Sequence, residues 1–210
     1  MKRIAIIGSG HLGQQILHHI QTDTDDKVVG FFDDFLEKGN SVKDLPILGG
    51  KEDVISVFQQ DIFDEIIIAI GYNHLEFKKQ IFETFKNKIP FYTFIHSASY
   101  IDPSAKIGEG SVIYPDCMID QNVKIGDNVL INISCSIAHD SLIGNHCFLS
   151  PAVAVAGFVS VSQQCILGIN STVIDNIHIS EKVQLGGGAV VIKNISESGL
   201  YVGNPVRFIR

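Results

Sequence analysis

Residues 101–126 read IDPSAKIGEGSVIYPDCMIDQNVKIG, and they open a stretch in which an aliphatic residue returns at every sixth position up to residue 191. Neither an α-helix, with a period of 3.6, nor a half-buried strand, with a period of 2, produces a strict period of six. A hexapeptide repeat is typical of a parallel β-helix. The aliphatic positions are Ile101, Ile107, Ile113, Ile119, Ile125, Ile131, Ile137, Ile143, Leu149, Val155, Val161, Leu167, Val173, Ile179, Leu185 and Val191.

This rhythm predicts the geometry of the repeat. One hexad fills about one face, so three faces make a coil of about eighteen residues and the stretch holds about five coils. The inward residues of successive coils stack at the spacing of neighbouring strands, ~4.8 Å. Each coil contacts only its neighbours, so the outer walls are flat and extended, which favours oligomers and shared sites.

The first part of the chain has a different pattern. Three continuous apolar runs end in glycine or aspartate. A helical pattern through Leu12, Ile16, Leu17 and Ile20 follows the first run, and the polar helical stretch Asn73–Lys88 follows the third. Apolar strands that alternate with helices indicate a parallel sheet covered on both faces. The runs are Ile4–Ile7, Val28–Phe32 and Glu65–Ile70.

We therefore predict two domains of α/β and all-β class. Residues 1–98 form a small Rossmann-like domain, half of a doubly wound unit with about four strands. Residues 99–210 form a parallel β-helix domain with a C-terminal tail that contains YVGNPVR.

Composition excludes several classes of protein. A net charge of −7 argues against a nucleic-acid partner, which would need a basic surface. No apolar run approaches the ~18 residues of a membrane span. The opening MKRIAIIGSGHLGQQ is not a signal peptide, because its apolar stretch is only about four residues long. We expect a cytoplasmic protein.

The four cysteines all lie on one phase of the repeat, two residues before the aliphatic positions. That phase otherwise carries mostly small residues, so we predict that the cysteines are buried core residues. No Cys-x-x-Cys spacing is present, and free thiols fit a reducing cytoplasm. The four are Cys117, Cys135, Cys147 and Cys165.

The first candidate site is Gly8-Ser9-Gly10-His11-Leu12-Gly13, a GxGxxG motif between a predicted strand and helix. Such glycines let the backbone approach a phosphate at a helix N-terminus. Asp33 or Asp34, at the end of the next strand, could accept hydrogen bonds from a ribose or a base. NAD, another nucleotide and a tight turn without ligand all remain open. We favour a mononucleotide or nucleotide-sugar, because a dinucleotide site normally uses both halves of a doubly wound sheet.

The second candidate site is His139-Asp140 on the repeat. The phase of His139 carries prolines and polar residues elsewhere, which places this histidine on the outer wall. Gly157 lies one coil later and would leave space and a bare N–H beside the imidazole. A base next to an oxyanion donor is what acyl transfer needs. Asp140 could orient the imidazole, and a solvated surface histidine is the alternative. His146 and His178 show no spacing that would add a metal site.

The chain resembles a known family through IIGSGHLG, AHDSLIG, LGGGAVV and YVGNPVR. It is similar to the sialic-acid O-acetyltransferases and bacterial nucleotide-sugar N-acetyltransferases, which are left-handed β-helix acyltransferases. The resemblance covers nearly the whole chain. It implies a homotrimer packed through the β-helices, with active sites between subunits, acetyl-CoA along the wall and the nucleotide-sugar on the N-terminal domain.

The same resemblance implies roles for individual residues. His139 matches the family's catalytic base, Asp140 its acidic partner and Gly157 a backbone donor to the thioester carbonyl. Some relatives carry a second histidine where this chain has Phe148, and His146 is a doubtful substitute. Coenzyme A would meet Gly186, Gly187, Gly188 and Arg207. The nucleotide-sugar would meet Gly8, Gly10, His11, Asp33 and Asp34, with Gly71 and Asn73 as weaker candidates from their place after a strand.

We therefore predict an acetyl-CoA-dependent N-acetyltransferase that needs no metal. It acts on the 4-amino group of a nucleotide-linked amino-dideoxy sugar and serves lipopolysaccharide or other glycan biosynthesis. The alternatives are an O-acetyltransferase for sialic acid or another sugar hydroxyl, a NAD-dependent oxidoreductase, and a non-catalytic nucleotide-sugar-binding scaffold. The nucleotide base, the sugar stereochemistry and the acyl chain length stay open.

Overall fold

The computed structural model describes residues 1–210 and divides them into two compact units, Met1–Thr93 and Phe94–Arg210. The sequence placed this division between residues 98 and 99. It lies earlier because β6 (Phe94–Ile95) already pairs in parallel with β9 (Val112–Ile113) as part of a coil. Ile95 stands one hexad before Ile101, so the six-residue rhythm begins there.

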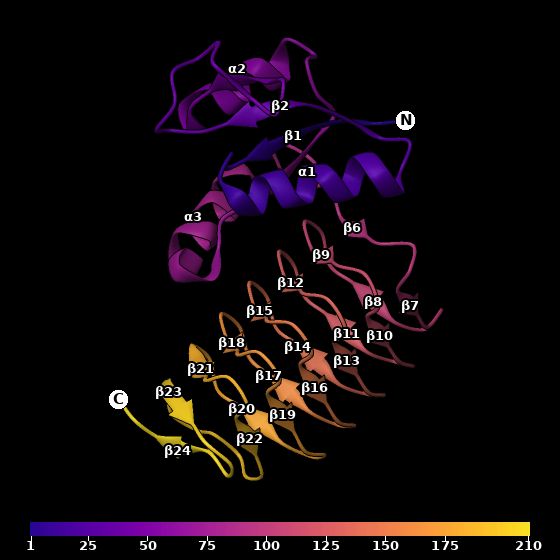
Figure 1. The fold of residues 1–210 in the computed structure, drawn as a ribbon, viewed down its shortest axis with the longest axis vertical. Coiled ribbons are helices and arrows are strands. Elements are labelled where there is room, and N and C mark those ends of the chain that lie inside the picture. Colours follow the sequence, from indigo (N-terminus) through magenta and orange to yellow (C-terminus); the bar gives the residue numbers. More distant parts are fainter. The chain divides into compact units, whose positions relative to one another are not determined.

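The N-terminal unit is a three-layer α/β domain (Figure 1). Its sheet has the order β3-β4-β2-β1-β5, and all pairs are parallel except the β3–β4 hairpin. The order of the four parallel strands is that of half a doubly wound fold, as predicted. The strands are β1 (Arg3–Ile7), β2 (Lys27–Phe32), β3 (Ser41–Val42), β4 (Leu45–Gly49) and β5 (Glu65–Ile68). The helices are α1 (His11–Asp23), η1 (Lys51–Asp53), α2 (Val54–Gln59), η2 (Tyr72–His74) and α3 (Leu75–Phe85).

The apolar pattern of this unit explains its layers. β1 lies between β2 and β5, so its residues are covered on both faces, and Ala5 and Ile6 are fully buried. α1 buries one face through Gly13, Ile16, Leu17 and Ile20. The carboxyl ends of β2, β1 and β5 therefore meet at one edge of the sheet, where the GxGxxG loop lies.

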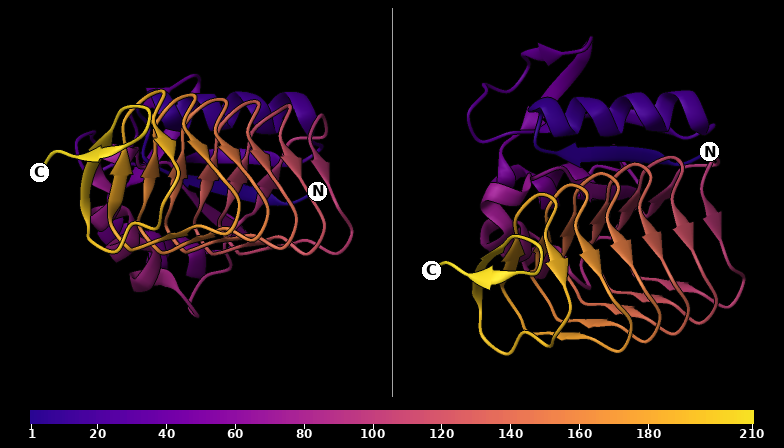
Figure 2. Two further views of the ribbon diagram at one scale, coloured as in Figure 1. Left: turned by 90° about the horizontal axis from the view of Figure 1, so that it is seen from below. Right: turned by 60° about the horizontal axis from the view of Figure 1, so that its bottom comes forward.

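The C-terminal unit is a left-handed parallel β-helix with three faces, as predicted (Figure 2). Face 1 holds β6, β9, β12 (Leu130–Ile131), β15 (Phe148–Leu149), β18 (Ile166–Leu167), β21 (Val183–Leu185), β23 (Gly199–Val202) and β24 (Arg207–Phe208). Face 2 holds β7 (Tyr100–Ile101), β10 (Met118–Ile119), β13 (Ser136–Ile137), β16 (Ala154–Val155), β19 (Thr172–Val173) and β22 (Val190–Val191). Face 3 holds β8 (Lys106–Ile107), β11 (Lys124–Ile125), β14 (Leu142–Ile143), β17 (Ser160–Val161) and β20 (His178–Ile179).

The core of the β-helix is the aliphatic column that the sequence predicted. Every position of the rhythm from Ile113 to Val191 is buried, while Ile101 and Ile107, in the first coil, are partly buried and pack against the same cluster. The four cysteines are also buried in this core and are free thiols, which confirms their predicted place. Cys117 Sγ, for example, donates to the carbonyl of Asn132 at 3.0 Å.

The corners between faces share one backbone conformation. One residue in every hexad adopts a left-handed φ between 55° and 70°, although most of these residues are not glycine. A left-handed backbone costs about 1–2 kcal/mol in a non-glycine residue, least in Asn and Asp. The positions are Gly110, Asp116, Asn122, Asn128, Ser134, Asp140, His146, Ala152, Phe158, Gln164, Asn170, Asn176, Lys182 and Gly188.

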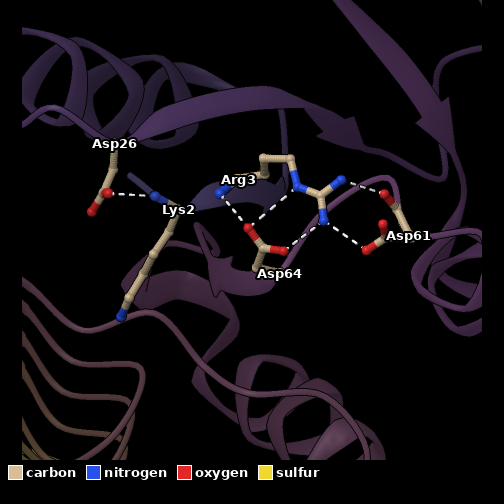
Figure 3. Close-up of polar contacts among 5 residues, drawn as sticks. All are labelled: Lys2, Arg3, Asp26, Asp61 and Asp64. Atoms are coloured by element: carbon tan, nitrogen blue, oxygen red, sulfur yellow. Dashed lines mark hydrogen bonds and ion pairs between the residues drawn. The ribbon is translucent and has the colours of Figure 1, made fainter.

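A charged network holds the start of β1 to the loop before β5 (Figure 3). The backbone N–H of Arg3 donates to Asp64 at 2.7 Å, and its guanidinium bonds Asp64 at 2.6 Å and Asp61 at 2.7 Å. The Arg3 side chain holds the pKa of the Asp64 carboxyl at about 2, below its ordinary 3.8. This network lies at the amino end of β1, opposite the edge that carries the GxGxxG loop.

The Asp64 pKa predicts how stability depends on pH. Because the pKa of Asp64 is lower in the folded state than in the unfolded state, the ionised carboxylate stabilises the fold. This stabilisation is complete above the unfolded-state pKa and is lost as the pH falls from about 4 to about 2. Asp64→Asn should therefore show a smaller loss of Tm across this window than the wild type in calorimetry. Asp25→Asn, at an exposed position, is the control and should behave as the wild type. An unchanged pH profile in Asp64→Asn would contradict this account.

Candidate functional site

The His139 corner comprises residues 138–141, between face 2 and face 3, with the equivalent corners of the adjacent coils. Neighbouring side chains diverge on an extended strand. Asp140 instead has a φ of 57°, and His139 Nδ1 lies 3.0 Å from Asp140 Oδ2. The left-handed corner thus brings the two predicted side chains together.

The imidazole has defined neighbours on its other sides. His139 is 41% exposed, and its ring meets the Phe158 ring edge-on at 5.1 Å between centroids. A Cβ at Gly157 would lie 2.8 Å from His139 Cε1 and 2.9 Å from Nε2, so any side chain there would displace the imidazole. With Nδ1–H assigned as the donor to the carboxylate, the lone pair lies on Nε2, beside Gly157.

The backbone N–H of Gly157 is a free donor next to this imidazole, since it makes no hydrogen bond within the chain. Some equivalent positions of the hexad cannot offer such a donor. Pro103 and Pro115 have no N–H, and the N–H of Asp127 donates to the side chain of Asn145 at 2.9 Å. A base beside an unused N–H can serve proton transfer and oxyanion stabilisation.

A hollow of about 310 Å³ lies on face 2 next to the His139 corner. Its wall includes Ala138, which directly precedes His139, and the exposed side chains of Tyr100 and Met118. The small residue Ser136 also lines it. This hollow was not predicted from the sequence, although the row of small outward residues on one phase of the repeat could have indicated it.

The glycines predicted to meet coenzyme A lie at a different corner from His139 on the same chain. Gly186, Gly187 and Gly188 follow β21, between face 1 and face 2, and Arg207 is exposed on β24. Gly188 has a left-handed φ of 67°, and a Cβ at Gly186 would lie 2.8 Å from Val202 Cγ1. One chain therefore does not bring these residues together with the His139 corner.

The other histidines of the repeat are also separate from His139. His146 is buried at the corner between face 3 and face 1, where its Nδ1 lies 3.0 Å from the side-chain nitrogen of Asn128. Phe148 is buried in β15 on face 1. No group of three His, Cys, Asp or Glu side chains in the structure could hold a metal ion.

The GxGxxG loop uses its glycines for two different purposes. Gly8 has a φ of +101°, and a Cβ at Gly13 would lie only 2.0 Å from the Gly8 carbonyl oxygen. These two glycines therefore make the turn and the close packing of α1. Gly10 faces open space, and exposed His11 begins α1 behind it. The loop thus leaves an accessible helix N-terminus.

Both carboxylate oxygens of Asp33 already accept hydrogen bonds within the chain. Its Oδ2 accepts from the backbone N–H of Ser9 at 3.0 Å and from the Ser9 hydroxyl at 2.6 Å, while Oδ1 accepts from the N–H of Phe35 at 3.0 Å. Burial alone raises the pKa of Asp33, but these hydrogen bonds outweigh it and lower the pKa. Asp33 therefore shapes the GxGxxG loop from the neighbouring strand.

The remaining predicted residues lie at the same edge of the sheet. Asp34 Oδ1 accepts from the backbone N–H of Lys51 at 2.6 Å. Gly71, after β5, faces open space, and Asn73 is exposed in η2. Phe35 was not among the predicted site residues; it is almost fully exposed and lines a small pocket with Gly8 and Asp34.

No helix has the length and apolar character that crossing a membrane requires.

Family comparison matches residues 3–85 to the PglD N-terminal domain. Among curated proteins, the UDP-N-acetylbacillosamine N-acetyltransferase of Bacillus subtilis (strain 168) is 31% identical over 115 residues. That alignment covers 54% of this chain and 51% of the enzyme, so it spans about half the length of the curated relative.

Several solved structures match the full chain. PerB from Caulobacter crescentus, in complex with CoA and GDP-perosamine, is 26% identical with a TM-score of 0.88, and the match covers 100% of this chain and 98% of that one. A histidine-to-alanine mutant of the GDP-perosamine N-acetyltransferase from the same organism gives 25% identity and a TM-score of 0.91, with the same coverage. The acetyltransferase domain of PglB from Neisseria gonorrhoeae shares the fold at 23% identity, a TM-score of 0.88 and full coverage of both chains.

The two roles of the loop glycines can be separated by substitution. Gly13→Ala should destabilise the protein by about 1–3 kcal/mol, because the new Cβ overlaps the Gly8 carbonyl. Gly10→Ala should leave stability nearly unchanged, since its φ of −65° and ψ of −170° suit alanine and the space is open. Urea unfolding of both variants measures the difference. Equal stability of the two variants would overturn this assignment.

Proposed function

We propose that the chain is a hexapeptide-repeat sugar N-acetyltransferase with a PglD-type N-terminal domain. It transfers the acetyl group of acetyl-CoA to the 4-amino group of a nucleotide-linked amino-dideoxy sugar. The observation that carries the mechanism is the His139–Asp140 contact beside the free N–H of Gly157. The solved relatives that bind CoA and GDP-perosamine support the choice of substrates.

In the proposed reaction the sugar amine attacks the thioester carbonyl of acetyl-CoA. A C–N bond forms, and the carbonyl oxygen gains negative charge that the Gly157 N–H stabilises. His139 Nε2 takes the proton from the attacking amine. The tetrahedral intermediate then collapses, the C–S bond breaks, and the imidazolium gives its proton to the departing CoA sulfur.

Asp140 acts through the imidazole in this proposal. Its carboxylate accepts the Nδ1–H at 3.0 Å, which holds the lone pair on Nε2 and stabilises the positive charge that develops there. The ring of Phe158 packs edge-on against the imidazole, and the missing side chain at Gly157 leaves space beside Nε2. A substrate amine would approach His139 from that side.

We assign nucleotide binding to the sheet edge of the N-terminal unit. Gly10 and His11 present the open N-terminus of α1, which favours a phosphate. Gly8 makes the turn, and Asp34, Gly71 and Asn73 flank it. Asp33 keeps Ser9 in place, so we assign it a supporting role where the sequence predicted a direct contact.

We further propose a homotrimer that packs through face 2. The outward residues of this face carry no charge, and two of them, Tyr100 and Met118, are exposed apolar side chains beside the His139 corner. Face 3 instead presents Lys106 and Lys124 outward. Since one chain separates Gly186–Gly188 and Arg207 from His139, a neighbouring subunit would complete the coenzyme A site. The outward row of face 2 is Tyr100, Met118, Ser136, Ala154, Thr172 and Val190.

We also propose a cytoplasmic enzyme of lipopolysaccharide or other glycan biosynthesis. Its buried free thiols suit a reducing compartment. A nucleotide-linked acetamido sugar is an activated building block for a glycosyltransferase. A screen of UDP-, dTDP- and GDP-linked 4-amino sugars with acetyl-CoA and thiol detection tests the activity, and matched hydroxyl sugars test O-acetylation.

His139→Ala should lower kcat by about 10²–10⁴-fold, the usual contribution of a general base, with little change in KM for the nucleotide-sugar. His178→Ala is the matched control, because His178 is an exposed histidine on face 3 of the same repeat. Steady-state kinetics with thiol detection measures both variants. An unchanged kcat in His139→Ala would contradict this mechanism.

The trimer can be tested with two arginine substitutions on consecutive strands. Ala154→Arg places a charge on face 2 and should give a monomer with little activity, since no interface tolerates an unpaired buried charge. Ser160→Arg places the same charge at the equivalent position on face 3 and should remain trimeric. Sedimentation velocity gives the mass, and circular dichroism checks the fold. A trimeric Ala154→Arg, or a monomeric wild type, would rule out this interface.

A further inference from the structure

The His139 corner continues as a column of side chains along the β-helix. Successive coils place Ser104, Asn122, Asp140 and Phe158 at the same corner position, eighteen residues apart. The column is polar on one side of Asp140 and aromatic on the other. Asp140 therefore has one neighbouring coil that can hydrogen-bond to its carboxylate, the coil that carries Asn122.

Asn122 hydrogen-bonds to Oδ1 of Asp140, the carboxylate oxygen that does not contact His139. Its Nδ2 donates to Asp140 Oδ1 at 3.1 Å, while Asp140 Oδ2 lies 3.0 Å from His139 Nδ1. Each oxygen thus has one side-chain partner, and the two contacts together fix the rotation of the carboxylate. The Asp140 side chain is 34% exposed, so its own packing does not fix that rotation.

Asn122 is itself anchored from the coil before it. Its backbone N–H donates to Ser104 Oγ at 2.8 Å, and that hydroxyl donates to Asp102 Oδ1 at 2.6 Å. The backbone N–H of Asp140 donates to the carbonyl of Gln121 at 3.0 Å, which fixes the spacing of the two coils. The amide is therefore presented to the carboxylate by a rigid support.

We propose that Asn122 is a positioning residue for the acetyl transfer, an inference that rests on the proposed function. It acts through Asp140. By holding Oδ1, it keeps Oδ2 on His139 Nδ1 and so keeps the lone pair of the imidazole on Nε2.

A merely structural role for Asn122 is the competing explanation, since asparagine suits the left-handed φ of 58° at this position. Asn176 is the matched control. It occupies the same corner position three coils later with a φ of 59°, is exposed, and bonds the neighbouring Asp175 at 2.8 Å. Glycine adopts this φ without strain, so Asn122→Gly and Asn176→Gly remove the amide at equal backbone cost.

Kinetics give the first test. Asn122→Gly should lower kcat about tenfold, the worth of one hydrogen bond to a charged group, with KM for both substrates nearly unchanged. Asn176→Gly should retain wild-type kcat. In an Asp140→Gly background, Asn122→Gly should cause no further loss, because a residue that acts through Asp140 has nothing left to position.

The tautomer of His139 gives a second test that needs no substrate. Two-bond 1H–15N spectra of the wild type should show the Nδ1–H form of neutral His139, assigned by the signal missing in His139→Gln. Asn122→Gly should shift the ring toward the Nε2–H form, and Asn176→Gly should not. A wild type without acetyltransferase activity would refute the proposed function and leave this spectroscopic test intact.

Three results would each overturn the proposal: equal kcat in Asn122→Gly and Asn176→Gly, a full tenfold loss in the Asp140→Gly background, or an unchanged tautomer in Asn122→Gly.

Discussion

The left-handed backbone at each corner is the constraint on which the β-helix depends. It recurs once per hexad from Gly110 to Gly188, and it turns the chain from one face to the next so that an aliphatic residue returns to the core. Its cost of about 1–2 kcal/mol in a non-glycine residue falls repeatedly on residues such as Phe158 and Lys182 that do not favour it. The stacked apolar core and the hydrogen bonds between coils offset that cost, so the corners are rigid platforms for side chains.

The candidate active site uses one of these corners directly. The left-handed φ that turns the chain at Asp140 also brings its carboxylate within hydrogen-bonding distance of His139. The register of the coils places Gly157 next to the imidazole. Hydrogen bonds between coils then supply the supporting groups, as in the contact from Asn122 to Asp140. A repeat without inserted loops can therefore build a base, an orienting acid and an oxyanion donor from wall residues alone. The residues proposed to hold coenzyme A, Gly186–Gly188 and Arg207, follow a different corner of the same chain, which supports the proposal that a neighbouring subunit completes the site.

Periodicity predicted the features that depend on one residue and its phase. It placed the aliphatic column and the four cysteines in the core and His139 on the wall, because burial follows directly from register. Some features depend on backbone conformation or on contacts between distant residues, and the sequence could not predict them.

The left-handed φ is shared by Asp140, His146 and Phe158, so residue type does not reveal it. Asp33 has the position of a ligand-binding carboxylate, yet Ser9 and Phe35 already occupy its oxygens. Ile95 extends the rhythm by one hexad, but a single apolar residue beside a domain boundary carries too little signal.

The central claim is that the corner formed by His139, Asp140 and Gly157 is where acyl transfer takes place. A crystal structure of the protein with coenzyme A tests it most directly. We expect the CoA sulfur within hydrogen-bonding reach of His139 Nε2, next to the N–H of Gly157, with the pantetheine arm between two subunits. A CoA thiol bound away from this corner, with His139 Nε2 open to solvent, would contradict it.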